Sequence, residues 1–295
     1  MIARISIALL MFLPWFAHGQ SEALVEAYRS YQGGDLAKAK ELVDKAVMSE
    51  THARDPEAWL LKGFICKDLY KAKASDPQAE TLRQEALESL HNSILYDEKA
   101  EFYENAKQAY DFLTRSYYND AARALNAMDG EAAIQAFEAY TDHVLKLDTT
   151  ADLRTRRVEF NNALGTVYAK EFNSDRTREG SFDKAVRAFQ RVLELDPENY
   201  GANYNLATLY YNRGVFKIRG IGADDDIPTI QQIQEVGREF FQLALPYMLK
   251  AHDMNPNRRE TLIGLEGIYY SLQDQENSDR YRMLFEELPP QEPDR

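Results

Sequence analysis

Residues Gly180 to Gly214 read GSFDKAVRAFQRVLELDPENYGANYNLATLYYNRG and contain two helical patterns separated by a break. Apolar residues recur at steps of three and four from Phe182 to Leu195, and again from Tyr204 to Tyr211, which is the spacing of amphipathic helices. Pro197 lies between the two patterns. Because proline has no backbone N–H and restricts the residue before it, it ends the first helix. The stretch therefore predicts two helices joined by a turn.

This pattern resembles the tetratricopeptide repeat, a pair of helices that recurs about every 34 residues. The resemblance implies that small residues stand where two helices touch, that aromatic residues fill the space between neighbouring pairs, and that a proline ends the second helix. The unit that carries these features most clearly ends at Pro197. Its matching residues are Gly165, Tyr168, Gly180, Ala185, Phe189 and Pro197.

The same register extends along most of the chain and predicts about six units. Other residues at repeat positions are Trp59 and Gly63 in the second unit, Tyr210, Ala244 and Pro256 in the fifth, and Tyr269 in the sixth. The match is weaker where Glu98 replaces the closing proline of the second unit and Ser278 replaces the alanine of the sixth. The resemblance implies an all-α fold, a right-handed superhelical solenoid of about six helix-turn-helix pairs over residues 20–288, followed by a polar tail at 289–295.

Three segments interrupt the repeats, near residues 71–77, 173–179 and 215–241. In a solenoid such insertions form loops or lengthen helices, often beside a binding surface. A solvated elaboration without a role is the alternative. In the longest segment we expect longer helices on both sides of its glycine-rich corner.

Residues 1–19 have the pattern of a secretory signal peptide. A basic start at Met1 to Arg4 precedes a run of apolar residues, Ile5 to Phe16, and small residues stand at Ala17 and Gly19, as cleavage sites require. The apolar run is shorter than the roughly 20 residues that span a bilayer. We therefore expect cleavage between Gly19 and Gln20, export to the periplasm or medium, and no membrane insertion of the mature chain. An uncleaved anchor or a buried helix is the alternative.

The composition and the absence of known motifs argue against several classes of function. The chain of 295 residues has 48 acidic and 35 basic side chains and a net charge of −13, which argues against nucleic-acid binding. Glu88 and His91 have the spacing of half a di-iron site, but no second copy follows, and Asp224 to Asp226 lack the EF-hand spacing. We predict no catalytic residues, no metal and no cofactor, so the protein is not expected to be an enzyme.

The resemblance places a binding groove on the concave face, which the first helix of each pair lines. In that register the predicted groove residues are Asn162, Thr166, Lys170, Tyr204, Thr208, Tyr211, Asn212 and Tyr270; Ile263 and Gly267 occupy equivalent positions in the sixth unit. Tyrosine and asparagine suit an extended peptide, because rings give contact area at low entropic cost and amides pair with main chain. Alternatively, Tyr204 and Tyr211 are the filler residues that an idealised repeat carries there.

These observations predict a non-catalytic scaffold in the cell envelope that binds a protein or peptide. The alternative is an accessory subunit of an outer-membrane or secretion assembly, held by protein contacts. Because the chain is strongly acidic, a basic or neutral partner suits it better than an acidic one. The identity of the partner and the oligomeric state are left open by the sequence.

Overall fold

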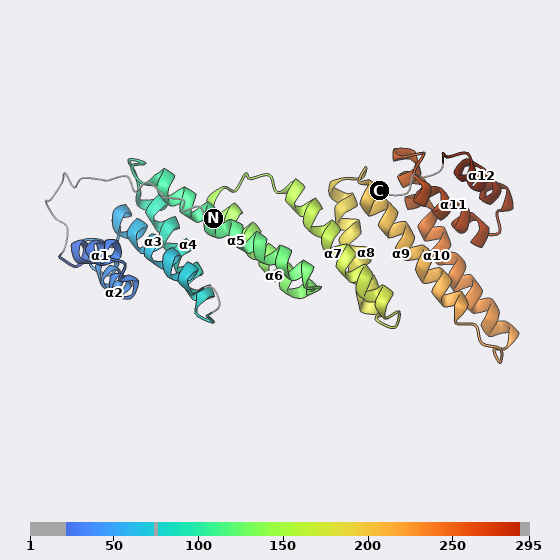
Figure 1. Ribbon diagram of the computed structural model, residues 1–295, viewed down its shortest axis with the longest axis horizontal. Helices are drawn as coiled ribbons and strands as arrows, with labels where there is room; N and C mark the ends of the chain where they lie inside the picture. Colours follow the sequence, from blue (N-terminus) through green and yellow to red (C-terminus); the bar gives the residue numbers. More distant parts are fainter. Residues whose placement is uncertain (1–21, 74–75, 290–295) are drawn as a thin grey trace, which may run out of the picture. The chain divides into compact units, whose positions relative to one another are not determined.

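The computed structural model describes residues 22–73 and 76–289, which form twelve α-helices and no strand (Figure 1). The predicted signal segment, 1–19, and residues 290–295 of the predicted tail lie outside the described residues. The predicted all-α fold class is confirmed. The helices are α1 (Glu22–Gln32), α2 (Leu36–Val47), α3 (Pro56–Ala72), α4 (Ala79–Tyr96), α5 (Tyr103–Asn126), α6 (Gly130–Leu147), α7 (Arg154–Ser174), α8 (Glu179–Leu195), α9 (Tyr200–Arg219), α10 (Ile227–Met254), α11 (Arg259–Ser271) and α12 (Gln275–Glu286).

The chain divides into two compact units, the first ending at Tyr117 and the second beginning at Tyr118, within α5. In the first unit α1 packs on α2, α3 on α4, and α2 on α3. In the second unit α7 packs on α8, α9 on α10, and α11 on α12, with further contacts from α8 to α9 and from α10 to α11. Each unit is therefore built from helix pairs that stack in chain order.

Three of the pairs share one tight turn between their helices. Gly34, Met128 and Gln273 have positive φ values of 81°, 61° and 64°, and each is followed by an aspartate whose carboxylate caps the next helix. In each turn the aspartate N–H donates to the backbone carbonyl five residues earlier in the chain. The N–H of the positive-φ residue donates to the backbone carbonyl three residues earlier. This is the Schellman motif, which normally selects glycine at the left-handed position, so Met128 and Gln273 adopt a conformation that costs side-chain-bearing residues energy.

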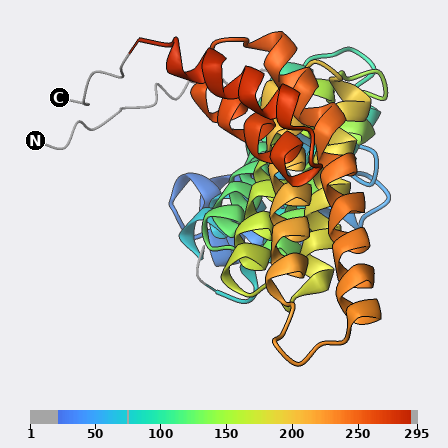
Figure 2. The same cartoon turned by 90° about the vertical axis from the view of Figure 1, so that its right-hand side faces the viewer.

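The three pairs that carry an insertion, α3–α4, α7–α8 and α9–α10, have a different connection in place of that turn. Residues 73–78 separate α3 from α4, and residues 175–178 separate α7 from α8. In the segment 215–241 most residues are helical, because α9 continues to Arg219 and α10 begins at Ile227. Figure 2 shows α9 and α10 side by side. Their contact includes a close backbone approach, since a Cβ on Gly214 would lie 2.9 Å from the carbonyl oxygen of Gly237.

Inside a pair, glycine lets an opposing side chain reach the helix backbone. A Cβ added to Gly165 on α7 would lie 2.7 Å from the ring of Phe189 on α8, and one added to Gly63 on α3 would lie 2.6 Å from Leu90 on α4. Real Cβ atoms essentially never approach that closely. A similar approach joins consecutive pairs, because a Cβ added to Gly130 of α6 would lie 2.6 Å from the ring and hydroxyl of Tyr168 of α7.

The other residues assigned to repeat positions differ in what they contact. Ala185 and Ala244 are fully buried, Tyr210 is buried, and Tyr269 stacks on Tyr281 with 5.6 Å between ring centroids. Pro197 and Pro256 follow the ends of α8 and α10. Trp59 is half-buried, and its Nε1 donates to the carbonyl of Ala53 at 2.9 Å.

Gly180 does not fill the structural role that its position predicts. It lies exposed in the first turn of α8, and a Cβ there would meet nothing within 4 Å. The insertion before it moves the start of α8 to Glu179 and replaces the tight turn, so no positive φ or close approach requires glycine here.

An acidic residue in the first turn of a second helix accepts a hydrogen bond from the following pair. Glu80 of α4 accepts from the Tyr117 hydroxyl of α5 at 2.6 Å, and Glu131 of α6 accepts from Tyr168 of α7 at 3.2 Å. Glu179 of α8 accepts from the guanidinium of Arg213 of α9. The three donors are buried, whereas the carboxylates are largely exposed. Since a buried donor left unpaired is costly, the contacts hold neighbouring pairs in register.

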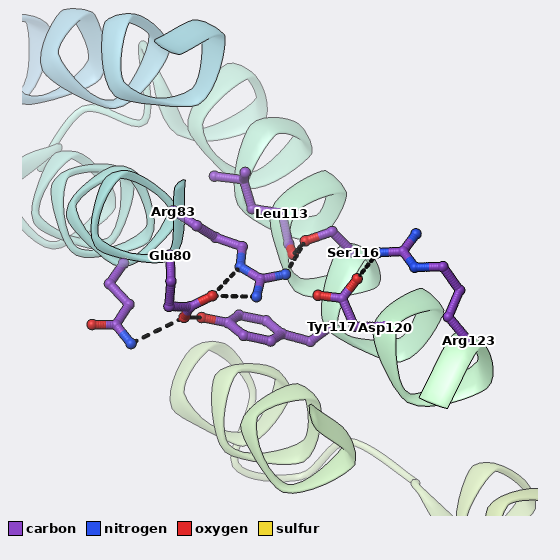
Figure 3. A network of polar contacts seen from close by, with 8 residues as sticks. Glu80, Arg83, Leu113, Ser116, Tyr117, Asp120 and Arg123 are labelled. Atoms are coloured by element: carbon purple, nitrogen blue, oxygen red, sulfur yellow. Dashed lines mark hydrogen bonds and ion pairs between the residues drawn. The ribbon is translucent and has the colours of Figure 1, made fainter. Parts of the chain in front are cut away.

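Arg83 extends the first of these contacts into a network (Figure 3). It is 6% exposed, lies 3.6 Å above the ring of Tyr117, and donates to Glu80 at 3.0 Å and to the Ser116 hydroxyl at 3.0 Å. Burial tends to raise the pKa of Glu80, but the hydrogen bonds from Tyr117 and Arg83 lower it overall. The carboxylate therefore stays ionised and pairs with the buried guanidinium between α4 and α5.

Two glycine-to-alanine substitutions test this packing. Gly165→Ala should lower the free energy of unfolding by about 1–3 kcal/mol, because the methyl group overlaps the Phe189 ring. Gly180→Ala, in an open position on the next helix, should leave it unchanged or raise it by up to about 1 kcal/mol through helix propensity. Urea unfolding followed by circular dichroism measures both. Equal effects would contradict the close contact at Gly165.

Candidate peptide-binding groove

A hollow of about 520 Å³ opens in the second unit beside α9 and α11. Its lining residues come from α9, α10, α11 and α12. They are Tyr204, Thr208, Tyr211, Asn212, Met248, Glu260, Ile263, Gly264, Glu266, Gly267, Tyr270 and Arg282. We call this hollow the α9–α11 groove.

One face of α9 supplies the polar and aromatic wall of the groove. Tyr204, Thr208 and Tyr211 are spaced by four and three residues, so they form a stripe along the helix. The ring of Tyr204 stacks on that of Tyr200 at 6.0 Å between centroids, with the planes 8° apart. Burial raises the pKa of Tyr204, so its hydroxyl is protonated and able to donate a hydrogen bond at neutral pH.

A hydrogen bond ties α9 to α11 near the groove. The Tyr200 hydroxyl and the Thr261 hydroxyl are 2.8 Å apart, and Thr261 is fully buried. Because both side chains can donate and accept, the pair satisfies the buried threonine. This contact places the first helices of two consecutive pairs next to each other.

Tyr211 packs against both α10 and α11. Its ring lies 5.5 Å from that of Phe241, and its hydroxyl oxygen would be 2.9 Å from a Cβ on Gly267. Gly267 therefore makes room for this side chain. Both Tyr204 and Tyr211 pack against the hydrophobic core while also lining the groove.

The α11 side of the groove exposes apolar surface to solvent. Tyr270 is 66% exposed and Ile263 is 50% exposed. The charged residues of the lining are largely paired, because Arg282 bonds to Glu266 at 2.9 Å and Glu260 bonds to Arg258 at 3.1 Å. The groove therefore offers exposed side chains of mainly apolar character, framed by ion pairs.

The structure brings five of the eight predicted groove residues together. Tyr204, Thr208, Tyr211, Asn212 and Tyr270 line the α9–α11 groove. The three predicted residues on α7 do not line it: Asn162 bonds to Asn199 at 3.3 Å, Thr166 bonds to its own helix, and Lys170 is exposed.

Five residues of the lining were not among the predicted positions: Met248, Glu260, Gly264, Glu266 and Arg282. Met248 comes from a second helix, and Arg282 reaches the groove from α12 through its pair with Glu266. Register arguments consider only the first helices, so they miss both. Glu260 precedes the groove positions of α11, and no sequence signal marks it.

A family model described as a TPR repeat matches residues 176–214. Residues 176–214 therefore resemble one tetratricopeptide repeat. The matched residues cover α8 and the part of α9 that lines the groove. Proteins built from this repeat are in general non-catalytic scaffolds for protein interaction, and the helix pairs described above have that architecture.

Comparisons with curated proteins and with solved structures do not indicate a function for this chain. No curated protein matches in sequence. Solved structures of an IFIT1 monomeric mutant with Gppp-AAAA and of the human IFIT1 dimer with m7Gppp-AAAA match at 15% and 14% identity, each with a TM-score of 0.39. Each match covers 90% of this chain and 59% of the IFIT1 chain. At that similarity neither the ligand nor the dimer of IFIT1 is carried over to this chain.

Two further observations concern the described residues only. Among the described residues, no group of three His, Cys, Asp or Glu side chains is arranged to hold a metal ion. No helix within 22–73 or 76–289 has the length and hydropathy to cross a membrane.

Proposed function

We propose that this TPR protein is a scaffold of the cell envelope that binds a protein or peptide in the α9–α11 groove. The observation that carries the proposal is the meeting of five groove residues from two different repeats around one hollow. Tyr270 and Ile263 offer apolar contact area there, and tyrosine gains such area at low entropic cost. A peptide that buries both side chains would cover surface that a monomeric protein otherwise leaves exposed.

The pairing of the groove charges indicates what kind of peptide fits. Arg282 is engaged by both Glu266 and Asp279, at 2.9 and 3.0 Å, so it is not a free cation for an acidic group. We therefore expect an extended segment with apolar or aromatic side chains and neutral or basic neighbours. The groove supplies no catalytic group that we can assign, and the proposed role is binding.

Site-specific photocrosslinking tests the groove. A photoreactive phenylalanine at position 270 should form a discrete protein adduct in the native cell, because Tyr270 faces the proposed ligand. The matched control is position 283 on α12, where Met283 is 61% exposed and does not line the groove. Adducts of the same pattern from both positions, or none from position 270, would count against the proposal.

The cell-envelope setting rests on the sequence of residues 1–19 and has its own test. Mass spectrometry of the protein from its native host should give a mature chain that begins at Gln20, recovered from the periplasm or the medium. Retention on the outer membrane after a salt wash would instead favour the accessory-subunit function. An uncleaved chain in the cytoplasm would contradict export.

A further inference from the structure

The last turn of α10 packs on α12 through a histidine. The ring of His252 meets the ring of Tyr281 at right angles, with 5.3 Å between the centroids and 88° between the planes. Tyr281 is buried and stacks in turn on Tyr269 of α11, with 5.6 Å between the centroids. His252 therefore belongs to an aromatic contact that joins α10, α11 and α12.

One nitrogen of the His252 ring is buried without a hydrogen bond. Among the residues that the structure describes, Nδ1 of His252 has no hydrogen-bond partner. The neutral imidazole tolerates this position when Nδ1 is the unprotonated nitrogen, because that nitrogen is an acceptor only. The imidazolium has a donor on both nitrogens. Protonation would therefore place an N–H and part of a positive charge where no group accepts them, which is costly.

The surroundings of the ring favour its neutral form. Burial is the largest influence, and it lowers the pKa of His252 below its usual 6.5. Asp253, the next residue of α10, favours the proton, and Arg280 of α12 disfavours it. Both of these residues are exposed, so solvent and salt screen their charges. Burial also raises the pKa of Tyr269 and of Tyr281, so these two neighbours stay neutral near pH 7.

The helices of this contact also build part of the α9–α11 groove. Met248, one turn before His252 on α10, lines the groove and packs on α11, since a Cβ on Gly264 would lie 2.5 Å from the Met248 Cε. Arg282 follows Tyr281 on α12 and lines the groove as well. A looser contact between α10 and α12 would therefore change the wall of the groove.

We propose that the His252 contact is an acid-sensitive switch, in which protonation of the ring releases α12 from α10 and loosens the groove. Histidine is the side chain that ordinarily changes charge between about pH 5 and 8. Because the packed state disfavours the protonated ring, the opened state takes up the proton first. The stabilisation by this contact is thus complete above about pH 6.5 and is lost progressively as the pH falls below that value. The consequence for a bound peptide rests on the function proposed above, whereas the release of α12 does not.

Hydrogen exchange of the full chain, followed by mass spectrometry, tests the release of α12. After correction for the intrinsic rate, the protection of the α12 amides should fall at least about fivefold from pH 7.5 to pH 5.0. In His252→Phe, which keeps an aromatic ring beside Tyr281 and takes up no proton, the protection should change less than about twofold. The matched control is His143→Phe on α6, which should show the same fall as the wild type.

NMR titration of the wild type gives a second measurement that needs no variant. The ring signal of His252, assigned through its backbone, should titrate with a midpoint below 6.5. A midpoint at or above that value, unchanged protection of α12 at pH 5.0, or an equal fall in the wild type and His252→Phe would overturn the proposal. Neither measurement uses a groove ligand, so each of these results would leave the proposed binding function standing.

Discussion

The structure depends on close contact between the two helices of a pair at a residue without a side chain. At Gly165 the ring of Phe189 occupies the space that a Cβ would need, and at Gly63 the side chain of Leu90 does the same. Because the interior is close-packed, these contacts fix the distance and rotation of the paired helices. The faces that remain, which pack on the next pair or line the groove, follow from that geometry.

Contacts between pairs add polar specificity to this apolar packing. An acidic residue in the first turn of a second helix meets a hydroxyl or guanidinium of the following first helix, as at Glu80 and Tyr117 or at Glu131 and Tyr168. Apolar surface alone would tolerate sliding of one pair along the next, whereas a hydrogen bond to a buried partner does not. The α9–α11 groove lies beside α9, which such a contact between Arg213 and Glu179 joins to α8.

The sequence predicts the helices and much of the groove, because both follow from a regular spacing. Proline marks helix ends, and the register places Tyr204, Thr208 and Tyr211 on one face. The repeat register predicts a structural role for Gly180 that the structure does not show, because the insertion at 173–179 shifts the start of α8. It also misses Arg282, whose position depends on how α12 packs. His252 meets Tyr281 only through the packing of α10 on α12, and no local pattern shows that.

The central claim is that α9 and α11, the first helices of consecutive pairs, lie side by side and line one groove. A double-mutant cycle on the Tyr200 and Thr261 hydroxyls tests it directly, because these groups are 2.8 Å apart and 61 residues separate them in sequence. Tyr200→Phe, Thr261→Val and the double variant would be compared by urea unfolding. The structure predicts a coupling energy of about 1 kcal/mol. Strict additivity of the two single effects would contradict it.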